Sequence, residues 1–148
     1  MPTTPEAAYD TVTNRFIAEF TAGAVAFTPE LRFDGKEKGA IPKGYFARFK
    51  MMNVLERQRT HRSGEPDDNR YQTAGVIFVQ VFAPRALETA LEDCRAMATI
   101  ARGIFRGKTF AGGIVFRDVR VVDIDERETK DNYVQKNVVM EFEYDEIA

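Results

Sequence analysis

The sequence predicts a single α+β domain over residues 1–148, with a mixed, mainly antiparallel β-sheet and two helices packed on one face of the sheet. A length of 148 residues suits one domain. Two stretches with helical spacing of apolar residues enclose or precede strand-like segments, and the turns between strands are short, which favours antiparallel or mixed pairing. Twelve Phe and five Tyr argue against a disordered chain.

The first expected element is a helix from about Pro5 to Ala22. Thr3 and Glu6 have the spacing of a capping box, and a proline suits the first helical turn because its missing N–H would be unpaired there. Gly23 then ends the helix. The apolar stripe consists of Ala8, Tyr9, Val12, Phe16, Ile17 and Phe20.

Several strands are expected next. Two short ones, at 24–27 and 31–33, are separated by Pro29, which suits an edge strand or a break. Alternating polarity predicts a long strand from Tyr45 to about Arg57. The segment from Tyr71 to Phe82 is apolar on both alternating faces except for Gln80, which predicts a central strand covered on both sides.

The second expected helix runs from Arg85 to about Arg106. Two last strands follow, at 114–124 and 133–144, and exposed loops are expected near 34–44, 59–69 and 125–132. One face of the helix carries Leu87, Leu91, Cys94, Ala98, Ala101 and Phe105, with Met97 and Ile100 beside it. In the last strand Val138, Met140, Phe142 and Tyr144 are expected on one face, and Asn137, Glu141 and Glu143 on the other.

Candidate catalytic residues are sparse. The single histidine, His61, lies in a polar loop between arginines, and Cys94 lies on the apolar face of a helix, where a buried, unreactive thiol is expected. The segment 102–109 is similar to a phosphate-binding loop. That motif needs four residues between its glycines and follows a strand, whereas here three residues separate Gly103 from Gly107 and the segment follows the expected helix. The sequence therefore predicts no enzyme, no catalytic residue and no cofactor.

No metal site is expected either. The acidic residues near the last turn have neither the spacing of a calcium-binding loop nor a glycine at its sharp turn, so a solvated hairpin is the simpler interpretation. No apolar run reaches the length of a membrane span, and the first residues lack the pattern of a signal peptide. One cysteine excludes an internal disulfide.

The charge layout is more informative than the net charge of −2. Six basic residues and one acid lie between Lys43 and Arg62, whereas ten acids and four basic residues lie between Asp118 and Ala148. These patches are either two solvated faces or complementary surfaces for head-to-tail association, which closes into rings or extends into filaments. The candidate interface residues are Arg48, Lys50, Arg57, Arg59, Arg62, Asp123, Asp125, Glu126 and Glu128.

Three segments together resemble the tail terminator proteins of long-tailed bacteriophages, the lambda-type minor tail proteins. The first is the opening helix with Arg15-Phe16 and the apolar segment after it. The second is 69–84, a polar loop followed by an aromatic residue, a glycine and a β-branched run that ends in Phe82-Ala83-Pro84. The third is the closing strand at 137–146. The chain departs from the family in the long, basic and Met-rich stretch 46–59.

This resemblance implies a structural protein that forms a ring, expected to be hexameric, at the neck-proximal end of the tail in the virion, after assembly in the host cytoplasm. Such a ring binds the tail tube protein, stops tube growth and offers a docking face to the head-side connector. DNA passes through its lumen without specific binding, so we expect the basic segment 57–62 at a subunit or tube interface, away from the lumen.

Three other functions stay open. Another neck or head-completion protein would bind the portal side instead of the tube. A small α+β enzyme or small-molecule binding domain would carry a deep pocket with convergent ionisable groups. A nucleic-acid-binding domain would show steep salt dependence of its DNA affinity, although the acidic C-terminal segment opposes phosphate binding.

Overall fold

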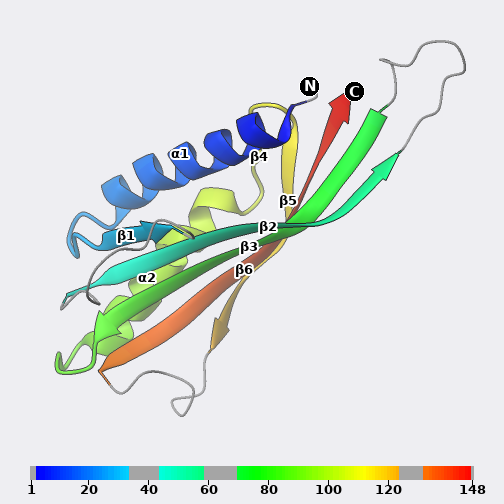
Figure 1. The fold of residues 1–148 in the computed structure, drawn as a ribbon. Coiled ribbons are helices and arrows are strands. Elements are labelled where there is room, and N and C mark those ends of the chain that lie inside the picture. Colours follow the sequence, from blue (N-terminus) through cyan, green and yellow to red (C-terminus); the bar gives the residue numbers. More distant parts are fainter. Residues whose placement is uncertain (1–2, 34–43, 59–69, 124–131, 148) are drawn as a thin grey trace, which may run out of the picture.

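A computed structural model describes residues 3–33, 44–58, 70–123 and 132–147. Two helices and a six-stranded sheet make up this part of the chain, which confirms the α+β class (Figure 1). The predicted loops near 34–44, 59–69 and 125–132 fall almost wholly outside the described residues. In chain order the elements are α1 (Pro5–Gly23), β1 (Glu30–Phe33), β2 (Phe46–Gln58), β3 (Arg70–Pro84), α2 (Ala90–Phe105), β4 (Thr109–Phe110), β5 (Ile114–Asp123) and β6 (Tyr133–Ile147).

The sheet is mixed, with the strand order β1-β2-β3-β6-β5-β4. Strands β1 and β2 pair in parallel, and the other neighbouring pairs are antiparallel. The three long strands β2, β3 and β6 lie side by side, and the end of β2 and the start of β3 extend beyond the helices as an arm (Figure 1). The central position of β3 agrees with the apolar sequence of this strand.

The helix α1 begins one residue later than the capping-box spacing indicates. Thr4 is the N-cap, and its side-chain oxygen accepts a hydrogen bond from the backbone N–H of Ala7 at 3.2 Å. The residue before a proline is driven into an extended conformation, so the cap is the residue that precedes Pro5. Along the helix Ala8, Val12, Phe16 and Phe20 are buried, as the spacing predicts, but Ile17 is exposed.

The prediction of a strand at 24–27 is wrong. The backbone N–H groups of Phe27 and Thr28 both donate to the carbonyl of Ala24, so this segment turns instead of extending. Thr28 has a φ of 45°, a left-handed conformation that no regular strand contains. The strand expected at 31–33 is present as β1, directly after Pro29.

The helix α2 begins at Ala90, five residues after the expected start. Residues 85–89 form turns, in which Leu87 N–H donates to the carbonyl of Pro84 and Ala90 N–H to that of Leu87. Leu87 therefore lies outside the helix, and both Leu87 and Leu91 are exposed, which corrects the expected apolar face. The buried face of α2 consists of Ala90, Cys94, Met97, Ala98, Ala101, Ile104 and Phe105.

The core joins residues of both helices to strand residues such as Phe49, Val79 and Val138, which share one face of the sheet. Phe16 of α1 stacks on Phe49 of β2 and on Phe105 of α2, with ring centroids 4.9 and 6.3 Å apart. α2 packs against β3, β5 and β6. Ile77, Val79 and Val81 on β3 are buried at every second position, as the pleat requires, and at one end of the sheet Phe46 and Phe82 are buried on the other face as well.

The opposite face of the sheet is not fully covered. Val76 and Phe78 on β3 are half-buried, so the expectation of a strand covered on both sides is wrong in this respect. The predicted orientation of β6 is confirmed, because its apolar residues from Val138 to Tyr144 are buried at alternate positions, whereas Glu141 is exposed. Neither helix in the described part of the chain combines the length and hydropathy that a bilayer span requires.

Candidate functional site

The less covered face of the sheet, hereafter the outer face, lies opposite the core residues of the long strands. It is formed by side chains that alternate with the core residues along the four long strands. Its members include Phe46, Arg48, Lys50 and Met52 on β2; Gln72, Val76, Phe78, Gln80 and Phe82 on β3; Tyr133, Gln135, Asn137, Val139, Glu141 and Glu143 on β6; and Arg117 and Arg120 on β5.

One end of the outer face is aromatic. Phe46 and Phe82 are opposite each other in the β2–β3 pair and stack with their ring centroids 4.2 Å apart. Tyr133 meets both rings edge-on, and the guanidinium carbon of Arg48 lies 5.9 and 5.8 Å from the two Phe centroids. Arg48, a predicted interface residue, is therefore held over an aromatic pair of its own chain, where its cation attracts the ring faces.

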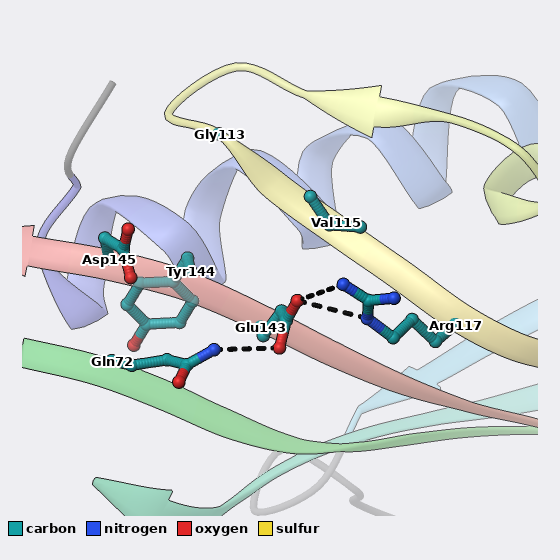
Figure 2. A pocket seen from close by; sticks show the side chains of 7 residues that line it. All are labelled: Gln72, Gly113, Val115, Arg117, Glu143, Tyr144 and Asp145. Carbon is teal, nitrogen blue, oxygen red and sulfur yellow. Dashed lines mark hydrogen bonds and ion pairs between the residues drawn. The ribbon is translucent and has the colours of Figure 1, made fainter. Parts of the chain in front are cut away.

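At the other end a polar cluster joins three strands, as Figure 2 shows. Arg117 of β5 donates from Nε and Nη2 to Glu143 Oε1 of β6, at 3.1 and 2.6 Å. Gln72 of β3 donates from Nε2 to Glu143 Oε2 at 2.8 Å. The hydrogen bond and charge of Glu143 raise the pKa of Arg117 above its ordinary value. Both carboxylate oxygens of Glu143 thus accept hydrogen bonds from neighbouring strands. The geometry indicates a contact between strands and not a general base.

Two shallow hollows flank this cluster. One, of about 360 Å³, is mainly polar and also includes Gly113, Val115 and Asp145 in its lining (Figure 2). The other, of about 300 Å³, is mainly apolar and lies beside Val54 and Leu55 of β2. Both hollows are open to solvent. Arg117 and Glu143, which line both of them, neutralise each other.

The apolar hollow borders an irregularity in β2. Asn53 pairs with Gly75 and Leu55 with Ala74, so Val54 is the extra residue of a β-bulge. Met52, Val54 and Leu55 are 40%, 67% and 49% exposed. We call these three residues the β2 apolar cluster. The sequence does contain a signal for this cluster. The run Met51-Met52-Asn53-Val54-Leu55 places apolar residues on both faces of an otherwise alternating strand.

The predicted charged interface is only partly described. Arg48, Lys50 and Arg57 lie on β2, and Asp123 is the last residue of β5. Strands β3 and β6 separate β2 from β5, so the structure does not bring these groups together within one copy. The remaining predicted interface residues, Arg59, Arg62, Asp125, Glu126 and Glu128, lie outside the described residues.

Asp123 has a partner that sequence reasoning missed. Lys136 lies opposite Asp123 in the β5–β6 pair, and its Nζ forms a hydrogen-bonded ion pair with Asp123 Oδ1. The bond and the charge of Lys136 lower the pKa of Asp123 below its ordinary value. Lys136 itself is 8% exposed, so its charge is balanced within the chain. Only the strand register, which the sequence does not state, places the two groups together.

The candidate nucleophile is enclosed. Cys94 is buried in α2, and its Sγ donates weakly to the carbonyls of Val81 and Val134, at 3.4 and 3.5 Å. Burial raises its pKa to about 11, which keeps the thiol protonated near neutral pH. His61 lies outside the described residues. Among the residues that the structure describes, no three of His, Cys, Asp and Glu are grouped as metal ligands would be.

Comparison with known proteins finds a similar fold and does not identify a function. No family model and no curated protein matches the chain. One solved structure, whose name describes no function, is similar with a TM-score of 0.58 at 15% sequence identity, over 91% of this chain and 94% of that chain. This likeness shows that another protein of nearly the same extent shares the fold.

Proposed function

We propose that this chain is a structural tail-terminator protein of a long-tailed bacteriophage. About six copies form a head-to-tail ring that caps the tail tube, stops tube polymerisation and offers a docking face to the head-side connector. The assignment to phage tails rests on the three sequence segments that resemble the family. The assignment to a ring rests on the structure of the sheet.

The observation that supports a ring is the separation of opposite charges on one rigid sheet. Arg57 of β2 pairs with Gln72, near the start of β3, whereas Asp123 of β5 pairs with Lys136, which pairs with Val81 near the end of β3. The two groups therefore lie at opposite edges and opposite ends of the sheet. A copy cannot bring its basic edge and its acidic edge together on its own, but successive copies in a head-to-tail arrangement place one edge beside the other, and such an arrangement closes into a ring or extends into a filament.

The same layout supports a passive lumen. A tube that DNA must traverse functions best when its lining does not bind phosphate strongly. Arg48 is held over two Phe rings and Arg117 is neutralised by Glu143, so these cations of the outer face are already engaged in their own chain. We place the basic segment that begins at Arg57 at a subunit or tube interface.

The test is a capping assay on tail tubes. Purified protein is added to growing tubes, and tube length and end structure are followed by negative-stain electron microscopy. A terminator gives tubes that stop growing and carry a ring at one end. Binding to portal-side connectors without any effect on the tubes would instead identify another neck protein, and the tail-terminator assignment would be wrong.

A charge-reversal pair sharpens the assay. Arg57→Glu changes the charge at the proposed interface, whereas Lys108→Glu makes the same change in net charge at an exposed turn after α2. Arg57→Glu is expected to slow ring formation and capping, because complementary charges steer association and select the register. Lys108→Glu should behave as the wild type, and an equal effect of both variants would contradict an interface role for Arg57.

A further inference from the structure

The first β-edge of the sheet is covered over only part of its length. β1 pairs with Phe46–Phe49 of β2 and then ends. Along the remainder of β2, at 51–58, no described strand pairs with the side that faces away from β3. We call this stretch the β2 edge. A long unpaired edge presents backbone N–H and C=O groups that another strand can use.

The charges of the β2 edge, Glu56 and Arg57, lie at one end of it, whereas the residues at the bulge are aliphatic. Natural edges are protected by charges, prolines or bulges that turn the edge away. Here the bulge itself presents Val54 and Leu55, and the three residues of the β2 apolar cluster are 40–67% exposed. Exposed aliphatic side chains next to unpaired backbone groups are typical of a surface that is covered in an assembly.

The opposite edge of the sheet is open in the same way. β4 pairs only with Ile114 and Val115 of β5, so the described strands leave β5 unpaired on that side from Phe116 to Asp123. We call this stretch the β5 edge. The β2 and β5 edges have similar lengths, and each contains one irregularity, at Asn53/Leu55 and at Arg117/Arg120.

The strand directions suit pairing between these two edges. The neighbours β2, β3, β6 and β5 alternate in direction, because all three pairs are antiparallel. In a head-to-tail arrangement of copies around an axis, the next β2 beside β5 continues this alternation and therefore pairs antiparallel. No strand has to reverse and no copy has to turn over.

The charges on the β5 edge do not oppose such a contact. Arg117 is bound to Glu143, Asp123 to Lys136, and Arg120 Nη1 donates to the backbone carbonyl of Asp118 at 2.8 Å. A twofold contact between two β2 edges, by contrast, would close as a pair of copies and could not continue into a ring. A ring therefore requires a different partner strand, and the β5 edge is the other edge that the described strands leave open.

We propose that the β2 edge of one copy pairs antiparallel with the β5 edge of a second copy, and that this contact covers the β2 apolar cluster. This contact deepens the proposed function, because the ring geometry assumed for it rests on that proposed function. Backbone hydrogen bonds between the strands supply affinity, and the exposed side chains at the bulge supply register. The result is a sheet that continues from copy to copy around the ring.

The chain offers a matched pair of variants for the test. Val54 and Val25 are 67% and 68% exposed, but Val25 lies in the turn after α1, away from both edges. The mass of Val54→Asp, Val25→Asp and wild type is measured by light scattering after size exclusion, over a range of protein concentrations. Thermal unfolding of each protein checks that both variants fold.

The expected result is a selective loss of self-association. Val54→Asp should raise the concentration at which copies assemble by at least about tenfold, because it places a charge in a desolvated contact. Val25→Asp should assemble as the wild type does. Equal behaviour of the two variants, or a wild-type chain that is monomeric at every concentration, would overturn the proposal.

Cross-linking identifies the partner strand and needs no destabilising charge. In a Cys94→Ala background, a protein with Val54→Cys is mixed with proteins that carry Asp118→Cys, Arg120→Cys or Val122→Cys, and the mixture is oxidised. A disulfide between the two different proteins is expected for at least one β5 position. A Val54→Cys protein that cross-links only to itself would show a twofold contact and overturn the assignment of β5.

The inference and the proposed function can fail separately. If Val54→Asp caps tail tubes as well as Val25→Asp does, the edge contact is wrong and the terminator function stands. If the two edges cross-link and wild-type rings form, but tubes continue to grow in their presence, the edge contact stands and the terminator function is wrong.

Discussion

Gly75 of β3 lies so close to Phe142 of β6 that residue 75 has no room for a side chain. A Cβ atom there would be 2.6 Å from Phe142 Cζ and 2.0 Å from the backbone oxygen of Met52 in β2. Gly75 also pairs with Asn53, at the edge of the bulge. The absent side chain therefore lets three strands approach closely where the arm leaves the body of the domain.

Gly75→Ala is expected to destabilise the protein by about 1–3 kcal/mol, the usual cost of overpacking, because the clash is with backbone as well as with a ring. Gly103→Ala is the control, since no atom lies within 4 Å of a Cβ there and alanine favours the helix by about 0.5–1 kcal/mol. Urea denaturation measures both. A Gly75→Ala protein as stable as the wild type would contradict the close approach.

Phe16→Ala should cost about 3–5 kcal/mol, because it removes the ring that joins α1 to β2 and α2. The neighbouring Ile17 is 37% exposed, so Ile17→Ala should cost less than about 1 kcal/mol. Chemical denaturation of the two variants compares adjacent positions of one helix. Similar losses of stability would show that α1 packs through a different face.

The Tyr45 hydroxyl donates to Asp93 Oδ2 at 2.7 Å, and this bond, burial and the carboxylate charge raise the pKa of Tyr45 to about 12. The folded state therefore holds this proton more tightly than the unfolded chain does. The resulting stabilisation is fully present below a pH of about 10 and is lost as the pH rises toward 12.

Ultraviolet titration of tyrosinate tests this prediction. Tyr45→Phe should remove the transition near pH 12, and Asp93→Asn should move that transition to lower pH, because the amide can accept the hydrogen bond but carries no charge. A tyrosinate titration that is identical in wild type and Asp93→Asn would show that the two groups do not interact in solution.

Cys94 should react with a thiol reagent at least about a hundredfold more slowly in the native protein than in denaturant, because the buried thiol is reached only through opening of the structure. The reaction is followed by the absorbance of the released thiolate at neutral pH. A Cys94→Ala protein with Arg95→Cys provides the exposed comparison on the same helix. Rapid reaction of native Cys94 would contradict its enclosed position.

Elements with a strong local signal were predicted well from the sequence. The four-residue spacing from Ala8 to Phe20 marks the buried face of α1, and the alternation from Val138 to Tyr144 marks that of β6. These patterns are periodic because each element buries one face. Errors came where local signals compete: the apolar segment 24–27 forms a turn, and Leu87 and Leu91 are exposed because α2 begins only at Ala90.

The candidate site shows the same division. Charge counting along the chain found Arg57 and Asp123 as members of opposite patches, but it could not find Lys136, which balances Asp123 only through the β5–β6 register. Nor could it single out Val54, whose exposure results from a bulge against Gly75 in another strand. A residue's partner across a sheet depends on which strands pair and with what offset.

The sequence by itself determined the α+β class, the buried faces of α1 and β6 and the separation of charge along the chain, because hydrophobic periodicity and charge can be read from neighbouring residues. Only the tertiary structure decided the strand order, the ion pair of Lys136, the outer face and the two edges that the described strands leave unpaired. These features arise from contacts between residues far apart in the chain, and such contacts are set by how the strands pack together.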